Sequence, residues 1–224
     1  GTRGPEPVVL SRFTDATRAW FTHAFAEPTP AQIGAWDAIS AGDNALVVAP
    51  TGSGKTLSAF LWALDRLVAS PPPEDPRHRC RVLYVSPLKA LAVDVERNLR
   101  SPLAGIRRES ARLGLPEPII EVGVRSGDTP ADERRRFATR PPDVFITTPE
   151  SLFLVLTSAA RESLRGVETV IVDENDKPLG PNQIGRVYVR DLSGRGVVYH
   201  NDPQKTADAH IAPGVFTLGE VGYV

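Results

Sequence analysis

The stretch "APTGSGKT" at residues 49–56 has the residue types and the spacing that can hold a phosphate chain. Gly52 and Gly54 allow the backbone to wrap an anion with its amides pointing inward. A helix expected to begin at Lys55 adds the positive end of its dipole. Lys55 is then placed to contact the β- and γ-phosphates, and Thr56 to ligate Mg²⁺. We therefore predict a phosphate-binding loop.

The surrounding sequence decides between this interpretation and a chance turn rich in Gly, Ser and Thr. An apolar run, "ALVVA", comes before the loop and a helix-forming segment comes after it, which is the context that the motif requires. Ala49 replaces the first glycine of the strict pattern. We expect a phosphate-binding loop, because the flanking strand and helix are stronger evidence than the one substituted position.

A second pair of chemically capable residues ends the apolar run "VIVDE" at residues 170–174. A nucleotide-hydrolysing enzyme presents its metal-binding carboxylates in this way, so Asp173 and Glu174 are candidates for catalysis. The next residues, Asn175 to Pro178, have the composition of a surface turn. The stretch is thus consistent with catalytic carboxylates or with an ordinary strand that enters a hairpin.

The elements that would position these residues alternate between short apolar runs and helix-length segments. The runs cover residues 45–50, 81–87, 119–124, 143–149 and 169–174. The helix candidates cover residues 55–68, 88–106, 130–138 and 150–164. Each run is apolar at nearly every position, as expected for strands that are buried on both faces. The alternation predicts an α/β fold with a parallel, doubly wound sheet.

The sequence changes character after Glu174. Alternating β patterns at residues 186–190 and 196–200 are separated by Gly, Asp and Ser, which indicates a small antiparallel β appendage. We therefore predict two parts, an α/β domain over residues 1–174 and a β-rich tail over residues 175–224.

Composition limits the classes of function. The net charge of −1 means that any nucleic-acid binding has to come from local basic patches. No apolar run reaches membrane-spanning length and no secretory leader is visible, so we expect a cytoplasmic protein without a membrane partner. The single cysteine, Cys80, is expected to be buried and inert. Because the chain has no methionine, we expect a processed start or a piece of a longer protein.

Six short motifs occur in order around the predicted phosphate loop. They are "PTPAQIGAW" (28–36), "APTGSGKT" (49–56), "SPLKALAVD" (86–94), "SGDT" (126–129), "TTPESL" (147–152) and "VIVDE" (170–174). Together they resemble the first RecA-like domain of a superfamily 2 helicase, most closely of the large helicase-related (Lhr) type, over residues 8–174. The resemblance implies a RecA-like P-loop fold that binds ATP and Mg²⁺.

The resemblance also implies roles for individual residues. Gln32 would read the edge of adenine, since a carboxamide both donates and accepts hydrogen bonds. The implied ATP-binding residues are Gln32, Thr51, Gly52, Ser53, Gly54, Lys55 and Thr56. The implied catalytic residues are Lys55, Asp173 and Glu174. Thr56 and Asp173 would hold Mg²⁺, and Glu174 would direct the attacking water.

The implied nucleic-acid contacts lie at strand ends and are Ser86, Pro87, Lys89, Thr148 and Pro149. Hydroxyls, a lysine and helix-start amides can hold the phosphates of one strand of DNA or RNA without reading bases. Lys89 is also consistent with a solvated surface lysine, and the arginines at 134–136 with a solvated helix face. Four aromatic side chains between residues 13 and 25 recur at helical spacing, and we expect them to pack a helix onto the domain.

The helicase resemblance implies a partner that the chain does not contain. Unwinding in this family needs a second RecA-like domain, whose arginines complete the ATP site and can raise the rate about 10³-fold or more. The family's Asp-Glu-x-His motif also lacks its histidine here, because Asn175 and Asp176 follow Glu174. We expect weak ATP binding, feeble hydrolysis and no unwinding by this domain alone.

Residues 170–224 resemble a segment of the adenylate-forming acyl-CoA synthetases, through "YHNDPQKTADAH" (199–210) and "GVFTLGEVGY" (214–223). Glu220 stands where that family has an aspartate for the ribose hydroxyls, and that family's phosphate loop and catalytic lysine are absent. We therefore expect no adenylation by the tail. The sequence therefore resembles a junction between two unrelated coding regions, as a gene fusion, a damaged reading frame or an artificial joining would produce. The alternatives are thus an acyl-CoA ligase fragment or a non-functional fusion product.

Overall fold

The computed structural model describes residues 7–47, 54–87 and 89–173, together with the backbone of three strands at 186–190, 210–212 and 215–221. Contacts between Cα atoms divide the chain into two compact units, residues 1–174 and 175–224, and each unit is described by itself. Within the described residues, no helix is both long and apolar enough to cross a membrane.

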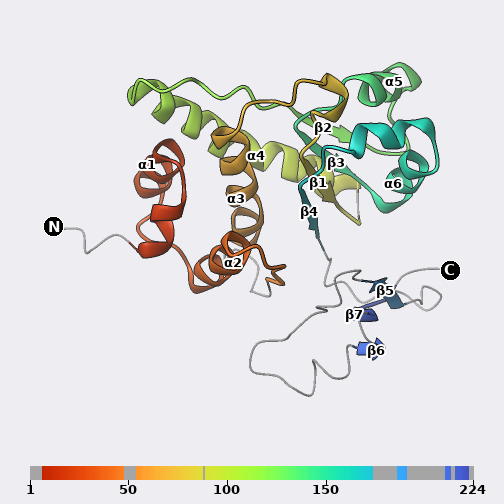
Figure 1. Ribbon diagram of the computed structural model, residues 1–224, viewed down its shortest axis with the longest axis horizontal. Coiled ribbons are helices and arrows are strands. Elements are labelled where there is room, and N and C mark those ends of the chain that lie inside the picture. Colours follow the sequence, from red (N-terminus) through yellow and green to blue (C-terminus); the bar gives the residue numbers. More distant parts are fainter. Residues whose placement is uncertain are drawn as a thin grey trace. The chain divides into compact units, whose positions relative to one another are not determined.

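Four parallel strands form the sheet in the described part of the first unit (Figure 1). They are β1 (Val82–Val85), β2 (Val122–Arg125), β3 (Val144–Thr147) and β4 (Thr169–Val172). The strand order is β2-β3-β1-β4, so β1 lies between β3 and β4 and pairs with both. All residues of β1 and β3 are buried, which explains their unbroken apolar sequence. The predicted parallel sheet is confirmed. The expectation that each run is buried on both faces is wrong for β4, because Val170 and Val172 are exposed.

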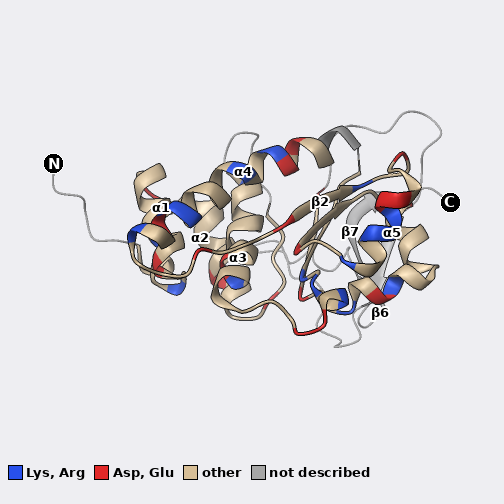
Figure 2. Ribbon diagram, turned by 90° about the horizontal axis from the view of Figure 1, so that it is seen from above, with Lys and Arg blue, Asp and Glu red and all other residues tan. Residues whose placement is uncertain are grey.

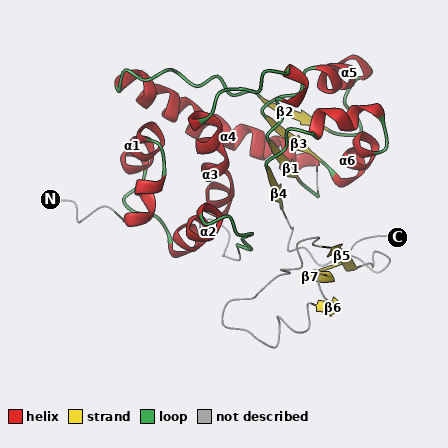
Figure 3. Cartoon of the chain, in the orientation of Figure 1, coloured by secondary structure: helices red, strands yellow, loops and turns green. Residues whose placement is uncertain are grey.

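Helices cover both faces of this sheet (Figures 1 and 3). One face carries α3 (Lys55–Ala69) and α4 (Lys89–Arg112), and the other carries α5 (Ala131–Thr139), α6 (Pro149–Leu156) and the 3-10 helix η3 (Ala159–Leu164). Phe60 of α3 packs with Tyr84 on the first face, and Val155 of α6 packs with Phe145 on the second. The predicted doubly wound arrangement is therefore also confirmed.

Cys80 lies just before β1 and is fully buried in the second of these layers. Burial raises the pKa of its thiol to about 12, and the negative charge of Asp143 adds to the effect. Since the thiolate is the reactive form, this cysteine is inert, as expected.

A group of helices with aromatic contacts precedes the phosphate loop. It contains the 3-10 helix η1 (Val8–Arg12), α1 (Asp15–Ala24) and α2 (Pro30–Ser40). The rings of Phe13 and Phe21 lie 4.9 Å and 5.5 Å from the ring of Trp36 in α2, measured between centroids. Trp20 lies against Gly105 of α4. These aromatic residues pack α1 onto the domain, as predicted.

Two predicted elements differ from the observed ones by more than the positions of their ends. The helix predicted at 150–164 is broken into α6 and η3, because the hydroxyls of Thr157 and Ser158 bond to nearby backbone groups and compete with helical hydrogen bonds. The strand predicted at 45–50 has no regular structure over residues 45–47, and its remaining residues lie outside the described part.

The residues of the second unit that the structure describes form three antiparallel strands in the order β5-β7-β6. They are β5 (Arg186–Arg190), β6 (His210–Ala212) and β7 (Val215–Val221). The β pattern predicted at 186–190 coincides with β5, whereas the pattern at 196–200 lies outside the described residues.

Candidate nucleotide and nucleic-acid site

The carboxyl ends of the four parallel strands meet at one edge of the sheet, which is where open α/β sheets bind ligands. Ser86 follows β1, Thr148 follows β3 and Asp173 follows β4, while β2 ends with Arg125. The topology therefore brings four polar side chains from distant parts of the sequence to one edge.

The last glycine of the predicted phosphate loop lies beside the glutamine predicted to read adenine. Gly54 precedes α3 with a φ of 81°, a conformation that favours glycine. A Cβ at this position would lie 2.7 Å from Nε2 of Gln32, so a side chain here would also require the Gln32 carboxamide to move. The next two residues begin α3, with Lys55 half-buried and Thr56 exposed. The structure thus places Gln32 at the N-terminus of α3.

A capping box fixes the orientation of Gln32. Its backbone N–H donates to Oγ1 of Thr29 at 3.3 Å, and its Oε1 accepts from the Thr29 N–H at 2.9 Å. The sequence Thr-Pro-x-Gln produces this cap, since Pro30 takes the first helical position. Because the carboxamide oxygen is engaged in the cap, the Nε2 end of this buried side chain lies beside Gly54.

Asp173 is bound to the end of β1 by two hydrogen bonds. Its N–H donates to the Val85 carbonyl at 3.0 Å, and its Oδ2 accepts from the Tyr84 hydroxyl at 2.6 Å. Burial raises the pKa of Tyr84 well above its usual value, and the hydrogen bond to Asp173 and the charge of that carboxylate raise it further. Tyr84 therefore stays protonated and donates to the carboxylate at neutral pH.

The residues predicted to contact nucleic acid lie at the ends of β1 and β3. Ser86 is fully buried, and its N–H donates to the Thr147 carbonyl at 2.9 Å. Thr148 is the N-cap of α6, where its hydroxyl oxygen accepts a backbone N–H of the first turn at 3.4 Å. Pro149 is exposed and Pro87 is half-buried. The prolines and the start of α6 are therefore more accessible at this edge than the Ser86 hydroxyl.

Five of the predicted site residues lie wholly or partly outside the described residues. Thr51, Gly52, Ser53 and Glu174 lie outside the described residues. Lys89 is the first residue of α4, but its side chain is outside the described part. The roles of these five residues stay predictions.

Arg125 is a charged residue at the same edge that the sequence reasoning missed. Its side chain is 7% exposed, its Nε has no hydrogen-bond partner, and no described carboxylate pairs with it. Burial lowers the pKa of its guanidinium, and the nearby charge of Arg134 lowers it further. A buried cation without a counter-charge is costly, so this position favours an anion. The signal in the sequence was an arginine at the end of the run "VGVR", directly before "SGDT".

The arginine run of α5 divides into two kinds of position. Arg134 is half-buried near Arg125, whereas Arg135 and Arg136 are exposed. Figure 2 shows these basic residues in blue on α5. The exposed pair is consistent with a solvated helix face.

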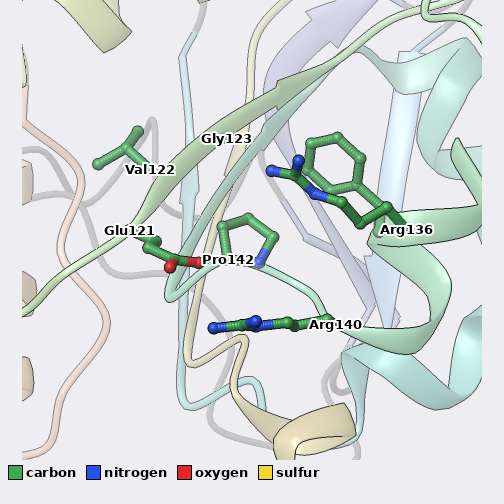
Figure 4. Close-up of a pocket in the computed structure, with 7 residues that line it drawn as sticks. Glu121, Val122, Gly123, Arg136, Arg140 and Pro142 are labelled. Carbon is green, nitrogen blue, oxygen red and sulfur yellow. The ribbon is translucent and has the colours of Figure 1, made fainter. Parts of the chain in front are cut away.

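A hollow of about 140 Å³ lies at the opposite, amino edge of the sheet (Figure 4). Its lining residues are Glu121, Val122, Gly123, Arg136, Phe137, Arg140 and Pro142. Next to it, Arg79 forms ion pairs with Glu121 at 3.3 Å and with Asp143 at 2.9 Å. The hollow contains none of the predicted site residues and is separate from the candidate site.

The model of the DEAD/DEAH box helicase family matches residues 29–190. The Lhr helicase/probable uracil glycosylase of Mycolicibacterium smegmatis is 67% identical over 173 residues, which are 77% of this chain and 11% of that protein. The ATP-dependent helicase Lhr-Core of Sulfolobus acidocaldarius is 43% identical over 171 residues, which are 76% of this chain and 19% of that protein. The chain therefore spans less than a fifth of the length of these relatives.

Solved structures lead to the same family. The helicase Lhr of Mycobacterium smegmatis bound to ssDNA and AMP-PNP superposes with a TM-score of 0.69 at 68% identity, over 74% of this chain and 21% of that chain. The DEAD-box helicase Mss116 bound to ssRNA and UDP-BeF has a TM-score of 0.59 at 20% identity, over 76% of this chain and 34% of that chain, which shows a shared fold alone. The chain belongs to the DEAD/DEAH box helicase family, and its matched part is the N-terminal motor domain of a superfamily 2 helicase of the Lhr type.

Proposed function

We propose that the carboxyl edge of the sheet binds ATP with Mg²⁺ and, beside it, one strand of DNA or RNA, as part of an ATP-dependent helicase. The observation that carries the proposal is the close approach of Gln32 to Gly54 at the start of α3. It brings an amide suited to adenine next to a helix N-terminus suited to phosphate.

The proposed ATP site combines α2 with the start of α3. Gln32 offers Nε2 to the base, and the amides of residues 51–56 surround the phosphates. Lys55 opens α3 and contacts the β- and γ-phosphates. The residues of this loop that precede Gly54 enter the proposal through their sequence pattern.

The residues of this edge fit Mg²⁺, which prefers oxygen ligands and keeps several of its waters. The exposed hydroxyl of Thr56 and the half-buried carboxylate of Asp173 would hold it. Bound Mg²⁺ would neutralise charge that develops on the β- and γ-phosphates. Glu174 follows Asp173 directly and is proposed to direct the attacking water.

The proposed strand site lies at the ends of β1, β2 and β3. Its residues are Ser86, Pro87, Lys89, Thr148 and Pro149, to which we add Arg125. The Mycobacterium smegmatis relative, which binds ssDNA, supports a nucleic acid as the ligand. Arg125 supports a phosphate in particular, because its buried guanidinium has no carboxylate partner among the described residues.

We propose that the motor comprises residues 1–174 and that residues 175–224 form a separate tail. The compact unit ends at Glu174, although the family match reaches residue 190. The relatives described above are all helicases, so the acyl-CoA ligase alternative gains no support. A second RecA-like domain is a proposed partner, and without it we expect slow hydrolysis and no unwinding.

A titration with a fluorescent ATP analogue in the presence of Mg²⁺ tests the nucleotide site. We expect Lys55→Ala to weaken binding about 10- to 100-fold, the range for losing a hydrogen bond to a charged group. Arg107→Ala is the matched control, because it removes a cation that is 65% exposed on α4 and paired with Glu117. Equal weak binding by the parent, Lys55→Ala and Arg107→Ala would remove the proposal.

A further inference from the structure

We propose that Tyr84 is a positioning residue that holds the Asp173 carboxylate in the orientation needed to face Mg²⁺, an inference that rests on the proposed ATP site. The Tyr84 hydroxyl donates to Oδ2 of Asp173 at 2.6 Å. Oδ1 of Asp173 receives no hydrogen bond from any described residue. One carboxylate oxygen is thus anchored while the other is left for the metal or its water.

The register of the sheet brings these two residues together. Tyr84 of β1 lies opposite Ile171 of β4, and Asp173 follows two positions further along. Because side chains alternate between the faces of a strand, all three lie on the same face. Tyr84 therefore reaches Asp173 diagonally across two neighbouring parallel strands, a contact between residues 89 positions apart in the sequence.

The hydroxyl is held by a ring that cannot easily move. Tyr84 is 2% exposed, and its ring centroid lies 5.1 Å from that of Phe60. Phe60 belongs to α3, the helix that begins at Lys55. The packing that fixes the hydroxyl on Asp173 therefore also involves the helix proposed to bind the phosphates.

A hydroxyl is chemically suited to this position. An arginine or lysine partner would orient the carboxylate but would also oppose a cation next to it. A neutral hydroxyl donates a short hydrogen bond and leaves the negative charge of Asp173 for Mg²⁺. Partners that orient the ligands of metals typically change metal affinity about 10- to 100-fold when they are replaced.

The test is Tyr84→Phe, which keeps the ring and removes only the hydroxyl. Binding of a fluorescent ATP analogue is measured against Mg²⁺ concentration and again with EDTA. We expect the metal-free affinity to be unchanged and the Mg²⁺ concentration for half-maximal enhancement to rise about tenfold. A merely structural role would change both affinities together or neither.

Ser163→Ala is the matched control, because it removes another buried hydroxyl, one that donates to Ala160 on the opposite face. It should leave the Mg²⁺ dependence unchanged, and the thermal melt of each variant checks that it is folded. An identical Mg²⁺ dependence in Tyr84→Phe and the parent would overturn the role of Tyr84 alone. A parent that binds no nucleotide at all would overturn the proposed ATP site as well.

Discussion

The Arg125 guanidinium is desolvated at the end of β2 without a counter-charge among the described residues. Arg125→Met keeps an unbranched apolar stem and removes the charge. We expect the variant to melt at a higher temperature, because a buried unpaired cation is lost. We also expect weaker binding of single-stranded DNA, with a slope of log affinity against log salt that is shallower by about 0.7, the value for one phosphate contact.

The melting temperature and the salt slope together distinguish a phosphate contact of Arg125 from a purely structural role. Arg107→Met removes a cation that is 65% exposed, and it should change neither the melting temperature nor the salt slope appreciably. A lower melting temperature for Arg125→Met with an unchanged salt slope would contradict a phosphate contact.

Single residues were predictable where a motif acts over a few neighbouring positions. Gln32 and Lys55 belong to short local patterns, so the sequence identified them as candidates before the structure placed Gln32 beside Gly54. Tyr84 and Arg125 were not identified, because their importance depends on burial and on neighbours from other strands. The sequence of a mostly apolar strand does not show which of its few polar side chains will be buried, or which will lack a hydrogen-bond partner.

At the scale of elements, the contact between α1 and α4 depends on the absence of a side chain. A Cβ on Gly105 would overlap with Cδ1 of Trp20. We expect Gly105→Ala to destabilise the fold by about 1–3 kcal/mol, the usual cost of overpacking. Urea unfolding followed by tryptophan fluorescence measures the difference.

Gly34→Ala is the control for helix propensity, since a Cβ on Gly34 of α2 meets nothing within 4 Å. It should stabilise the protein by about 0.5–1 kcal/mol, because glycine inside a helix is unfavourable. If Gly105→Ala is stabilising to the same extent, the described packing of Trp20 is wrong.

Strands β1, β3 and β4 were easier to predict than the ends of the helices. The runs around β1, β3 and β4 are continuous and apolar, and each strand falls inside its predicted range. The helix after β3 ends early because Thr157 and Ser158 have local hydrogen bonds that a periodicity argument does not include. Helix α4 continues to Arg112, six residues beyond its predicted end. The added residues are mostly polar, so the periodicity of apolar residues did not predict them.

At the scale of the whole molecule, one strand leaves apolar surface uncovered. Val170 and Val172 of β4 are 58% and 57% exposed, and β4 is the outermost strand of the described parallel sheet. We expect the double variant Val170→Thr, Val172→Thr to self-associate less than the parent, because Thr keeps the β-branched shape but is polar. Size-exclusion chromatography with light scattering over a concentration series measures this.

An exposed valine away from the sheet separates a local effect from general polarity. Val8 is 79% exposed, and Val8→Thr should leave association unchanged, since scattered surface valines are ordinary. Equal association of the double variant and the parent would show that β4 is not the surface responsible.

The end of β1 is hydrogen-bonded on both sides, to Asp173 through the Val85 carbonyl and to Thr147 through the Ser86 N–H. The end of β1 therefore connects Asp173 of the proposed ATP site with Ser86 and the end of β3 in the proposed strand site, and we expect each ligand to change the affinity for the other. Thermodynamic linkage makes this cooperativity reciprocal, so the factor by which ATP alters the affinity for a strand equals the factor by which the strand alters the affinity for ATP. If the two affinities are coupled in this way, a single RecA-like domain couples ATP binding to strand binding without a second domain.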